Sequence, residues 1–258
     1  MPKLLLDPKF VVSEYLSGKS AAKIARENGC SVWSVIERLR NEKIVQRPNN
    51  VPHSLNLSEN DKTKFLSLVD GLMLGDGSIH KKGYIQVHQH VKRLGWLEQI
   101  QQEFATINCV SKIHKLKPKK NPAFIDGRQI MTGEHYGLYT QAVIELREQR
   151  KRWYPNGKIV PKDVFINDLS TAMWFSGDGT HNGYSLTFCT QGFTKECVDM
   201  LHTKLNDKFC IKSTFREHRE NQYVVSISNK KDSLKLRNAV IKNIPECCLY
   251  KFDGLKEF

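Results

Sequence analysis

No apolar run in the sequence approaches the roughly 20 residues that a helix needs to cross a bilayer. The opening Met-Pro-Lys-Leu-Leu-Leu-Asp also holds too short an apolar stretch for a secretory signal, so we expect mature sequence from the first residue. These two absences argue against a membrane protein and against a secreted protein. The hydrophobic share of 40% argues in turn against a disordered chain.

Cysteine pairs of the Cys-x-x-Cys kind are missing as well, although the sequence has seven cysteines. An odd number, with two of them adjacent at 247 and 248, makes a poor disulfide framework or zinc site. We therefore expect no structural metal, and free thiols that serve as small core residues in a reducing compartment. That compartment would be the cytoplasm of a prokaryote or phage-infected cell, or the matrix of an organelle.

Acidic residues are scarce relative to basic ones, because 27 Asp and Glu face 40 Lys and Arg, for a formal charge of +13. Residues 1–50 hold 9 basic and 5 acidic side chains, and residues 51–258 hold 31 and 22. The excess is therefore spread along the chain. Counterion release makes nucleic acid the usual partner of such a surplus. A merely basic protein without that partner is the alternative.

The first 46 residues predict a small helical domain. Serines and glycines that suit helix ends separate three segments of apolar periodicity. Gly29 is expected at positive φ in the turn between the second and third segments. A stretch rich in proline and asparagine, 47–57, then predicts a linker. The three helices are expected over residues 9–16, 21–28 and 31–42.

The segment SAAKIARENGCSVWSVIERLR within this domain resembles the helix-turn-helix of homeodomain-like, resolvase-type DNA-binding modules. The resemblance implies that the third helix enters the major groove of DNA, with Arg40 and Lys43 near phosphate. A plain three-helix bundle is the alternative. The side chains expected to face the groove are those of Ser31, Trp33, Ser34 and Arg38.

Residues 58–258 alternate between helical and strand patterns, and the order occurs twice. Each half is expected to run helix, two strands, helix, two strands, helix, which predicts an α+β fold of two pseudo-symmetric αββαββα repeats. The repeats would cover about 58–160 and 161–258. Helices are expected to begin near Lys62, Val91, Gln141, Asp168, Thr194 and Ser233. The clearest strands lie at 84–90, 111–117, 136–140, 184–190, 212–218 and 223–228.

Each half contains an apolar helix that ends in Gly-Asp-Gly, and the two aspartates, Asp76 and Asp178, are 102 residues apart. A single Gly-Asp-Gly is a weak signal because both residue types are common in turns. Its recurrence after an apolar helix in each half is a much stronger signal of two related repeats. The strands that follow also match, since an offset of 101 pairs Gln86 with Thr187. At an offset of 100, Lys112 and His114 are expected to correspond to Lys212 and Thr214.

These segments resemble the LAGLIDADG homing endonucleases in their single-chain, two-repeat form. Aligned to the nine-letter motif, the first copy covers 69–77 and the second 171–179. The second copy ends in WFSGDG, which is similar to the WFMDDG of one intron-encoded subgroup. YPNGKIVP at 154–161, TQGFTKECVDML at 190–201 and YKF at 250–252 are similar to further pieces of that subgroup. Leu74 departs from the motif at its sixth letter, a position that is structural in the family.

The resemblance implies that the two motif helices pack about a pseudo-twofold axis, with small residues where they cross. Asp76 and Asp178, each helped by the carbonyl of Gly75 or Gly177, would then hold Mg²⁺, because hard oxygen ligands suit that ion. Mn²⁺ or Ca²⁺ would fit the same sites, with Ca²⁺ expected to be non-productive. The implied reaction is in-line hydrolysis of both DNA strands by water, which leaves short 3′ overhangs.

Three further residues are catalytic candidates by the same resemblance. Lys158 in NGKIVP and Lys251 in YKF would each offset charge near a scissile phosphate. A solvated surface lysine is the alternative for either. Gln86 matches a strand glutamine that positions water in the family, and its counterpart Thr187 implies that the two strands need not be cut at equal rates.

Specificity is expected from the polar faces of the two sheets, whose side chains would contact base edges in the major groove. Any single one of these residues is as readily explained by solvent as by DNA. The candidates on the first sheet are Tyr84, Gln86, His88, His90, Lys112 and His114, and those on the second are Ser185, Thr187, Gln191, Lys212, Thr214 and Arg216. The lysines expected to meet phosphate are Lys115, Lys117, Lys119 and Lys120.

The sequence thus predicts a monomeric, site-specific double-strand DNA endonuclease that acts on a long and nearly unique target and has no membrane partner. Its N-terminal module would lengthen the recognised site or tether the enzyme to DNA. Two alternatives stay open, because a scaffold does not fix a function. One is a catalytically silent intron maturase, which would bind RNA, and the other is a DNA-binding regulator.

Overall fold

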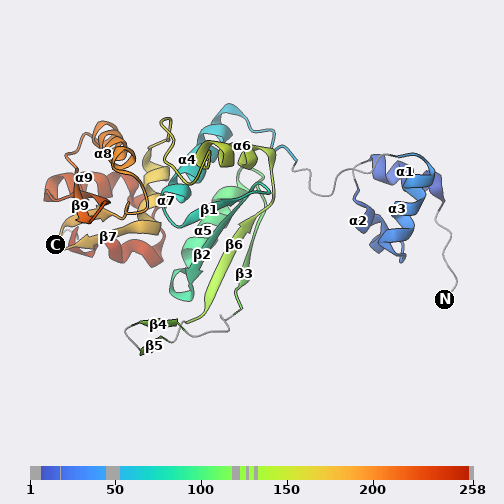
Figure 1. Ribbon diagram of the computed structural model, residues 1–258, viewed down its shortest axis with the longest axis horizontal. Coiled ribbons are helices and arrows are strands. Elements are labelled where there is room, and N and C mark those ends of the chain that lie inside the picture. The colour runs from blue at the N-terminus through green and yellow to red at the C-terminus, as the bar shows by residue number, and fades with distance from the viewer. Residues whose placement is uncertain are drawn as a thin grey trace. The chain divides into compact units, whose positions relative to one another are not determined.

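The chain folds into two units in a computed structural model that describes residues 7–17, 19–44, 53–117, 123–125, 128–130 and 133–255 (Figure 1). The N-terminal unit covers Met1–Val51 and the C-terminal unit covers Pro52–Phe258. Each unit has a hydrophobic core of its own. Within the described ranges, no helix is long and apolar enough to span a membrane.

Three short helices make up the N-terminal unit: α1 (Pro8–Leu16), α2 (Ala21–Glu27) and α3 (Val32–Asn41). Their bounds agree with the predicted helices to within one residue at each end. Ser20 and Ser31 cap α2 and α3, because their hydroxyls accept hydrogen bonds of 3.1 Å from backbone amides in the first turn. Gly29 has a φ of +61°, which confirms the predicted turn. The core consists of Val11, Tyr15, Ile24, Ala25, Val35 and Leu39.

The C-terminal unit holds one four-stranded antiparallel sheet from each half of its chain. The first half runs through α4 (Glu59–Leu74), β1 (Gly77–His80), β2 (Tyr84–His90), η1 (Val91–Arg93), α5 (Leu94–Ala105), β3 (Ser111–Lys115), β4 (Ala123–Ile125), β5 (Arg128–Ile130), β6 (His135–Thr140) and α6 (Ile144–Trp153). The second half runs through α7 (Asp168–Asp178), β7 (Gly179–Asn182), β8 (Ser185–Phe188), α8 (Lys195–Phe209), β9 (Thr214–Arg219), β10 (Gln222–Ile227), α9 (Lys230–Val240), η2 (Ile241–Asn243) and η3 (Glu246–Leu255).

The two sheets have equivalent strand orders, β1-β2-β6-β3 and β7-β8-β10-β9. Helices α4 and α7 pack against each other in the middle of the unit, between the two sheets (Figure 1). Helices α5 and α6 pack against the first sheet, and α8 and α9 pack against the second. The α+β fold of two αββαββα repeats is therefore confirmed, with the β4–β5 hairpin as an addition to the first repeat.

The predicted order included a first strand in each half, but the sequence patterns did not give its position. β1 and β7 begin at the glycine that closes each Gly-Asp-Gly turn, and each is only four residues long. Such short segments carry too little alternation to be read as strands on their own. Their strand conformation comes from pairing, for example Ser78 opposite Gln86 and Thr180 opposite Thr187.

The close approach of α4 and α7 depends on small residues, as the motif resemblance implies. A Cβ atom on Gly71 would lie 2.4 Å from the backbone oxygen of Ser170 and 2.7 Å from Cβ of Met173. Farther along the pair, a Cβ on Gly177 would lie 3.1 Å from the backbone nitrogen of Asp76. Side chains at these points would push the helices apart, and the two Gly-Asp-Gly turns would separate with them.

A buried carboxylate ties α4 to the rest of the unit. Asp70 is fully buried and accepts hydrogen bonds from Arg152 Nη1 (2.5 Å) and Nη2 (3.0 Å). Trp153 Nε1 (2.9 Å) and the backbone nitrogen of Phe165 (2.8 Å) also donate to it. A buried charge is tolerated only when it is paired and hydrogen-bonded in this way. The interaction holds α4 against the end of α6 and the segment that precedes α7.

Part of the segment predicted as a linker contacts the C-terminal unit. Residues 45–52 lie outside the described residues, whereas residues 53–57 pack onto the C-terminal unit. Leu55 lies in its core, and both Ser54 Oγ and the Leu55 backbone nitrogen donate to Glu145 Oε1, at 2.6 and 2.9 Å. The proline-rich composition gave no sign of this docking, because the partner residue Glu145 is about 90 residues away in the sequence.

All seven cysteines lie within the described residues and are free thiols. Cys109 and Cys248 are fully buried in the core of the C-terminal unit, which is the role predicted for them. Burial raises the pKa of the Cys109 thiol to about 12, so this group stays protonated at neutral pH.

Candidate active site

Two acidic side chains stand at the carboxyl ends of the packed helices α4 and α7. Asp76 follows Gly75, the C-cap of α4, and Asp178 is the last residue of α7. The backbones touch here, since a Cβ on Gly75 would lie only 3.5 Å from Cα of Gly177. Burial and then the charge of Asp76 raise the pKa of the Asp178 carboxyl to about 6. The two carboxylates therefore share one electrostatic site.

The first acid is held by a glutamine and an arginine from the neighbouring sheet and turn. Gln89 Nε2 donates to Asp76 Oδ2 at 2.7 Å, and the Gln89 side chain is almost fully buried. Arg93 Nη1 lies 3.7 Å from the same oxygen, and Arg93 Nη2 donates to the carbonyl of Gly177 at 3.2 Å. The guanidinium also lies 5.0 Å from the centre of the Trp96 ring. Arg93 therefore bridges the acid of one motif and the backbone of the other.

Lys251, a predicted catalytic residue, closes the end of α7. Its ammonium group is buried and donates to the carbonyls of Phe175, Ser176 and Gly177 at 3.0, 2.9 and 3.0 Å. A cation at this position complements the negative end of the helix dipole. Burial and then the charge of Arg93 lower the pKa of Lys251 to about 8.

Lys158, the other predicted lysine, reaches the acids from the segment after α6. Its Nζ lies 3.4 Å from the carbonyl of Gly77 and 5.5 Å from the centre of the Phe193 ring. Burial of the ammonium group lowers the pKa of Lys158, whereas the charges of Asp178 and Asp76 raise it. The structure thus brings both predicted lysines and both predicted acids into one site.

The donor set at this site fits a hard divalent cation. Among the described residues, no group of three or more His, Cys, Asp and Glu side chains could hold a metal ion. An ion held here would therefore rely on Asp76 and Asp178, with water and phosphate oxygens as further ligands. The pKa of the Asp178 carboxyl, raised by burial and then by the charge of Asp76, supports the fit, because a bound cation would favour the charged forms of both carboxylates.

One predicted metal ligand has other partners in the structure. The carbonyl oxygen of Gly177 accepts hydrogen bonds from both Lys251 and Arg93. Two positive donors oppose the approach of a cation to that oxygen, since like charges repel. The metal role predicted for the Gly177 carbonyl is therefore less well supported than that of the two carboxylates.

Gln86, predicted to position water, lies on the polar face of β2, opposite Ser78 and Tyr139. The amide that does contact the first acid belongs to Gln89. A sequence signal for Gln89 existed, because it continues the apolar parity of Ile85 and Val87 and is therefore a polar residue at an inward position. Arg93 carries no comparable signal, since it comes close to Gly177 only through the fold.

The polar faces of the two sheets carry most of the predicted DNA contacts. In the first sheet, Gln86, Tyr139 and Lys112 lie side by side on neighbouring strands. Tyr139 was not among the predicted contacts, although it has the outward parity of its strand. By the alternation of each strand, the same two faces also present Tyr84, His88, His90, His114, Ser185, Thr187, Thr214 and Arg216.

The register of the second sheet corrects one predicted correspondence between the repeats. Thr187 pairs with Ser226, and Ser226 pairs with Thr214. Since Gln86 and Thr187 are equivalent, Lys112 matches Thr214 rather than Lys212. The offset of 100 was wrong by two residues because neither of the short edge strands β3 and β9 carries an apolar pattern strong enough to fix its alignment.

Several predicted contacts lie elsewhere. Lys115 pairs with Tyr136, on the opposite face of β3 from Lys112, and forms an ion pair with Glu134. Lys117 follows the end of β3, Gln191 follows β8 and Lys212 precedes β9. Lys119 and Lys120 lie outside the described residues.

In the N-terminal unit, three of the predicted groove-facing residues, Ser31, Trp33 and Ser34, lie at the start of α3, whereas Arg38 lies in its last turn. The hydroxyls of Ser31 and Ser34 are 2.8 Å apart, and Arg38 Nη1 donates to the carbonyl of Ser34 at 2.9 Å. The Trp33 side chain is 64% exposed, which is unusual for so large an apolar group.

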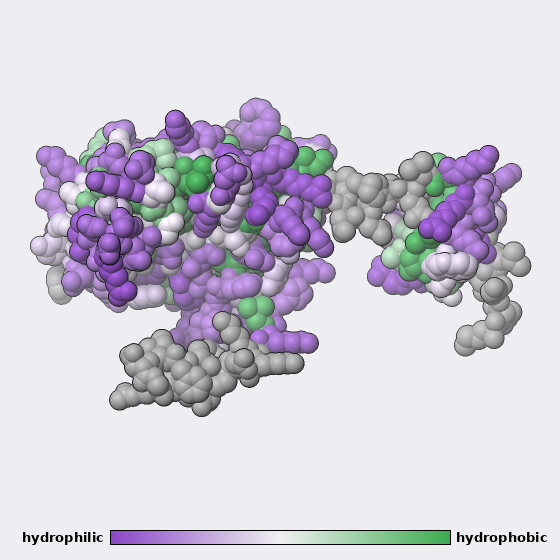
Figure 2. Space-filling view, in the orientation of Figure 1, coloured by the Kyte–Doolittle hydropathy of each residue, from purple (hydrophilic) through white to green (hydrophobic). Residues whose placement is uncertain are grey.

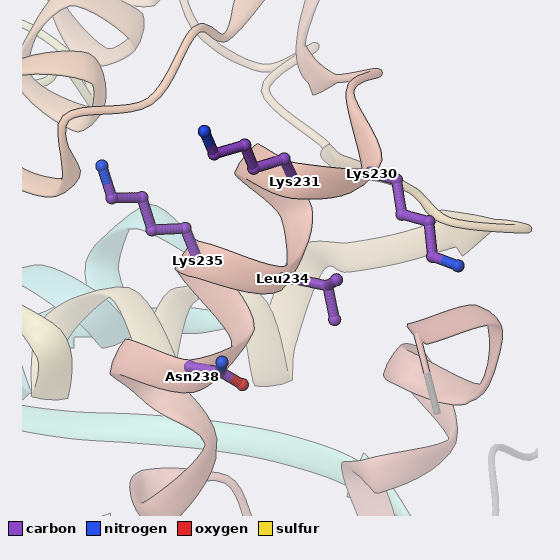
Figure 3. A pocket seen from close by; sticks show the side chains of 5 residues that line it. All are labelled: Lys230, Lys231, Leu234, Lys235 and Asn238. Atoms are coloured by element: carbon purple, nitrogen blue, oxygen red, sulfur yellow. The ribbon is translucent and has the colours of Figure 1, made fainter. Parts of the chain in front are cut away.

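Outside the acidic site, the surface carries a further pocket. The face shown in Figure 2 is mostly hydrophilic, with apolar residues in small patches. A shallow pocket lies along one face of α9, and Figure 3 shows its lysines extending from the helix in different directions. It is lined by Lys230, Lys231, Leu234, Lys235 and Asn238, and none of these belongs to the acidic site.

Comparisons with known proteins agree with the two-repeat fold. The model of the LAGLIDADG DNA endonuclease family matches residues 66–234. The uncharacterized protein MJ1098 of Methanocaldococcus jannaschii is 31% identical over 213 residues, which cover 81% of this chain and 80% of that protein. The cytochrome b mRNA maturase bI2 of Debaryomyces hansenii is 30% identical over 182 residues, or 64% of this chain and 66% of the maturase.

A solved structure shows the same fold. The homing endonuclease I-WcaI bound to its DNA recognition sequence has a TM-score of 0.59 and 23% identity, over 77% of this chain and 95% of that one. The chain belongs to the LAGLIDADG DNA endonuclease family.

Proposed function

We propose that the chain is a homing endonuclease that cuts both strands of a specific DNA site with the help of a divalent cation such as Mg²⁺. The observation that carries this proposal is the pairing of Asp76 and Asp178 at the touching ends of α4 and α7. Both acids come from one chain, so a monomer suffices for a double-strand cut. The WFSGDG ending of the second motif supports a place in the intron-encoded subgroup.

The two acids would hold the cation, which would supply Lewis acidity and lower the pKa of a bound water. Gln89 orients the Asp76 carboxylate by donating to its Oδ2. Arg93 keeps the two motifs in contact through Gly177. The hydrolysis of a phosphodiester requires no covalent enzyme intermediate, and the family resemblance implies short 3′ overhangs.

Positive charge around the acids prepares the site for the DNA backbone. Lys158, Lys251 and Arg93 lie close enough to both acids to change their electrostatics. The lysines offset the negative charge that develops on a phosphate in the transition state. The formal charge of +13 and the polar sheet faces support binding of a long duplex.

The test is cleavage of tiled genomic DNA from the source, free of the inserted element, in Mg²⁺ with sequencing of the ends. We expect the wild-type chain to make one staggered cut, and Asp76→Asn and Asp178→Asn each to lose double-strand cleavage by at least about a thousandfold. Asp207→Asn is the matched control, because Asp207 is an exposed acid on α8 and the substitution removes the same charge. Wild-type protein that binds DNA without ever cutting it would contradict the proposal.

The N-terminal unit is proposed as a second DNA contact. Its short α3 follows a serine cap and presents the exposed Trp33 in its first turn, and this supports insertion of that end into a groove. A separate contact on the same duplex would raise the local concentration of the catalytic unit.

An intron maturase is the second candidate, favoured by the 30% identity to the maturase bI2. This candidate predicts binding of the chain's own intron transcript and acceleration of splicing in vitro. The Asp76→Asn variant separates the two functions, because it would lose DNA cleavage and keep RNA binding. A chain that neither binds nor splices that transcript would exclude the maturase.

A further inference from the structure

The two polar sheet faces can be compared row by row, because their strands pair in equivalent registers. One row crosses all four strands of the first sheet and consists of Ser78, Gln86, Tyr139 and Lys112. The equivalent row of the second sheet consists of Thr180, Thr187, Ser226 and Thr214. Three long side chains in one sheet are thus matched by three short hydroxyl side chains in the other.

At two positions beside these rows, the side chains of the first sheet are again longer than those of the second. His80 and Tyr84 of the first sheet match Asn182 and Ser185 of the second. Two positions differ in the opposite direction, because His114 is matched by the longer Arg216 and Gly137 by Val224. The first face therefore extends farther from its backbone than the second at most equivalent positions.

The side chains of the first face are also held in place for contact. Tyr139 Oη lies 2.9 Å from His88 Nε2, and the rings of Tyr84, His88 and His114 surround the Tyr139 ring at 5.6–6.4 Å between centres. Gly137 makes room for the cluster, because a Cβ there would lie 2.8 Å from Tyr139 Cε2. Rings that are fixed before binding lose little conformational entropy when they meet a base edge.

At the centre of the second face, two hydroxyl groups form a hydrogen bond with each other. Thr187 Oγ1 and Ser226 Oγ are 3.2 Å apart, and Ser226 is buried. The position that matches Gly137 is the apolar Val224, also buried. Short hydroxyls that bond to each other reach base edges through intervening water more readily than directly.

We infer that the two sheets read the two halves of one DNA target by different means, the first by direct side-chain contact with base edges and the second mainly through water. The half-site under the first sheet is therefore the more stringently recognised of the two. This inference rests on the proposed function, since it takes the ligand of both faces to be one DNA duplex.

The difference is measurable base pair by base pair. A direct, well-oriented contact discriminates against a wrong base by roughly 5- to 150-fold. Under the first sheet we expect losses of that size when single base pairs are changed. At the symmetry-related positions under the second sheet we expect losses below about threefold, because a water layer adapts to several bases.

The experiment uses the full chain and a library in which each base pair of the target is substituted singly. Cleavage in Mg²⁺ and retention in a binding gel are both scored, so that the profile does not depend on cutting. Tyr139→Phe keeps the ring and removes only the hydroxyl, and the half-site whose profile it changes is the one under the first sheet. Replacing Gln86, Tyr139 and Lys112 by Thr, Ser and Thr, with folding checked by circular dichroism, should flatten that half of the profile.

Each outcome supports or overturns the inference, and some of them also test the proposed nuclease function. Unequal halves, with the stringent half altered by Tyr139→Phe, support the inference. Equal halves, or a stringent half that neither Tyr139→Phe nor the triple replacement alters, overturn it. A chain that binds with unequal halves but does not cut supports the inference while the proposed nuclease function falls. A chain with no sequence preference in either assay overturns both.

Discussion

Asp178 lies where burial and the charge of Asp76 both oppose its ionisation, and its pKa is raised to about 6. Asp76 is more exposed and accepts a hydrogen bond from Gln89. Two acids of the same motif thus have different surroundings. Because the folded-state pKa of Asp178 exceeds its unfolded value, its contribution to stability is full below pH 4 and is lost as the pH rises through 6. Burial and the neighbouring charge therefore both disfavour the ionised form of Asp178, and a bound cation would favour it.

The variant Asp178→Asn should stabilise the metal-free protein at pH 7.5 by on the order of 1–3 kcal/mol, because it removes a partly buried charge that lies close to Asp76. The gain should shrink toward zero near pH 4, where wild-type Asp178 is protonated. Urea denaturation at both pH values measures the difference, and Mg²⁺ should stabilise the wild type more than the variant. An equal difference at both pH values would show that the shift in pKa is not the cause.

At the scale of elements, the pairing of α4 and α7 positions the site. Gly71 lets the backbones touch, Asp70 ties α4 to Arg152 at the end of α6, and Lys251 caps the last carbonyls of α7. The acids need no flexible loop to meet, since each stands at the end of a rigid helix. Changes in the helix seam should therefore affect stability and catalysis together.

Gly71→Ala should destabilise the fold by about 1–3 kcal/mol, as expected for overpacking, because its Cβ would collide with Ser170 and Met173. Gly192→Ala is the matched control, since nothing lies within 4 Å of a Cβ at that position. Chemical denaturation of both variants gives the comparison. Similar losses in the two variants would contradict the role of Gly71 in the seam.

At the scale of the whole molecule, two units with separate cores share one chain. The paired acids and both sheets belong to the C-terminal unit alone. The N-terminal unit adds a helix end with an exposed tryptophan and 9 of the chain's 40 basic residues within residues 1–50. Under the proposed function, cleavage resides in one unit and part of the DNA affinity in the other.

A protein that lacks residues 1–51 should cut at the same position as the full chain but bind its target at least about tenfold more weakly. Dissociation constants from gel shifts and mapped cleavage ends test both parts of this prediction. Trp33→Ala in the full chain should reproduce part of the loss, because that side chain is exposed and outside the core. Unchanged affinity after truncation would argue for a plain helical bundle.

Much of the fold was predictable because its signals are local. The helix caps at Ser20 and Ser31, the turn at Gly29 and the alternation in β2 act over only a few residues. The recurrence of Gly-Asp-Gly likewise revealed the two repeats and the acid pair. The positions of the edge strands β1 and β7 could not be predicted, since their conformation depends on the strands they pair with.

The sequence by itself determined the two repeats, their helices and the two acids, because these follow from periodicity, capping and a duplicated motif. Only the tertiary structure decided that Gln89 contacts Asp76, that Arg93 reaches Gly177, and that Lys112 aligns with Thr214. The reason is physical. A hydrogen bond between residues 84 positions apart, or the register of a short edge strand, is set by how whole elements pack, and no local pattern of residues records that packing.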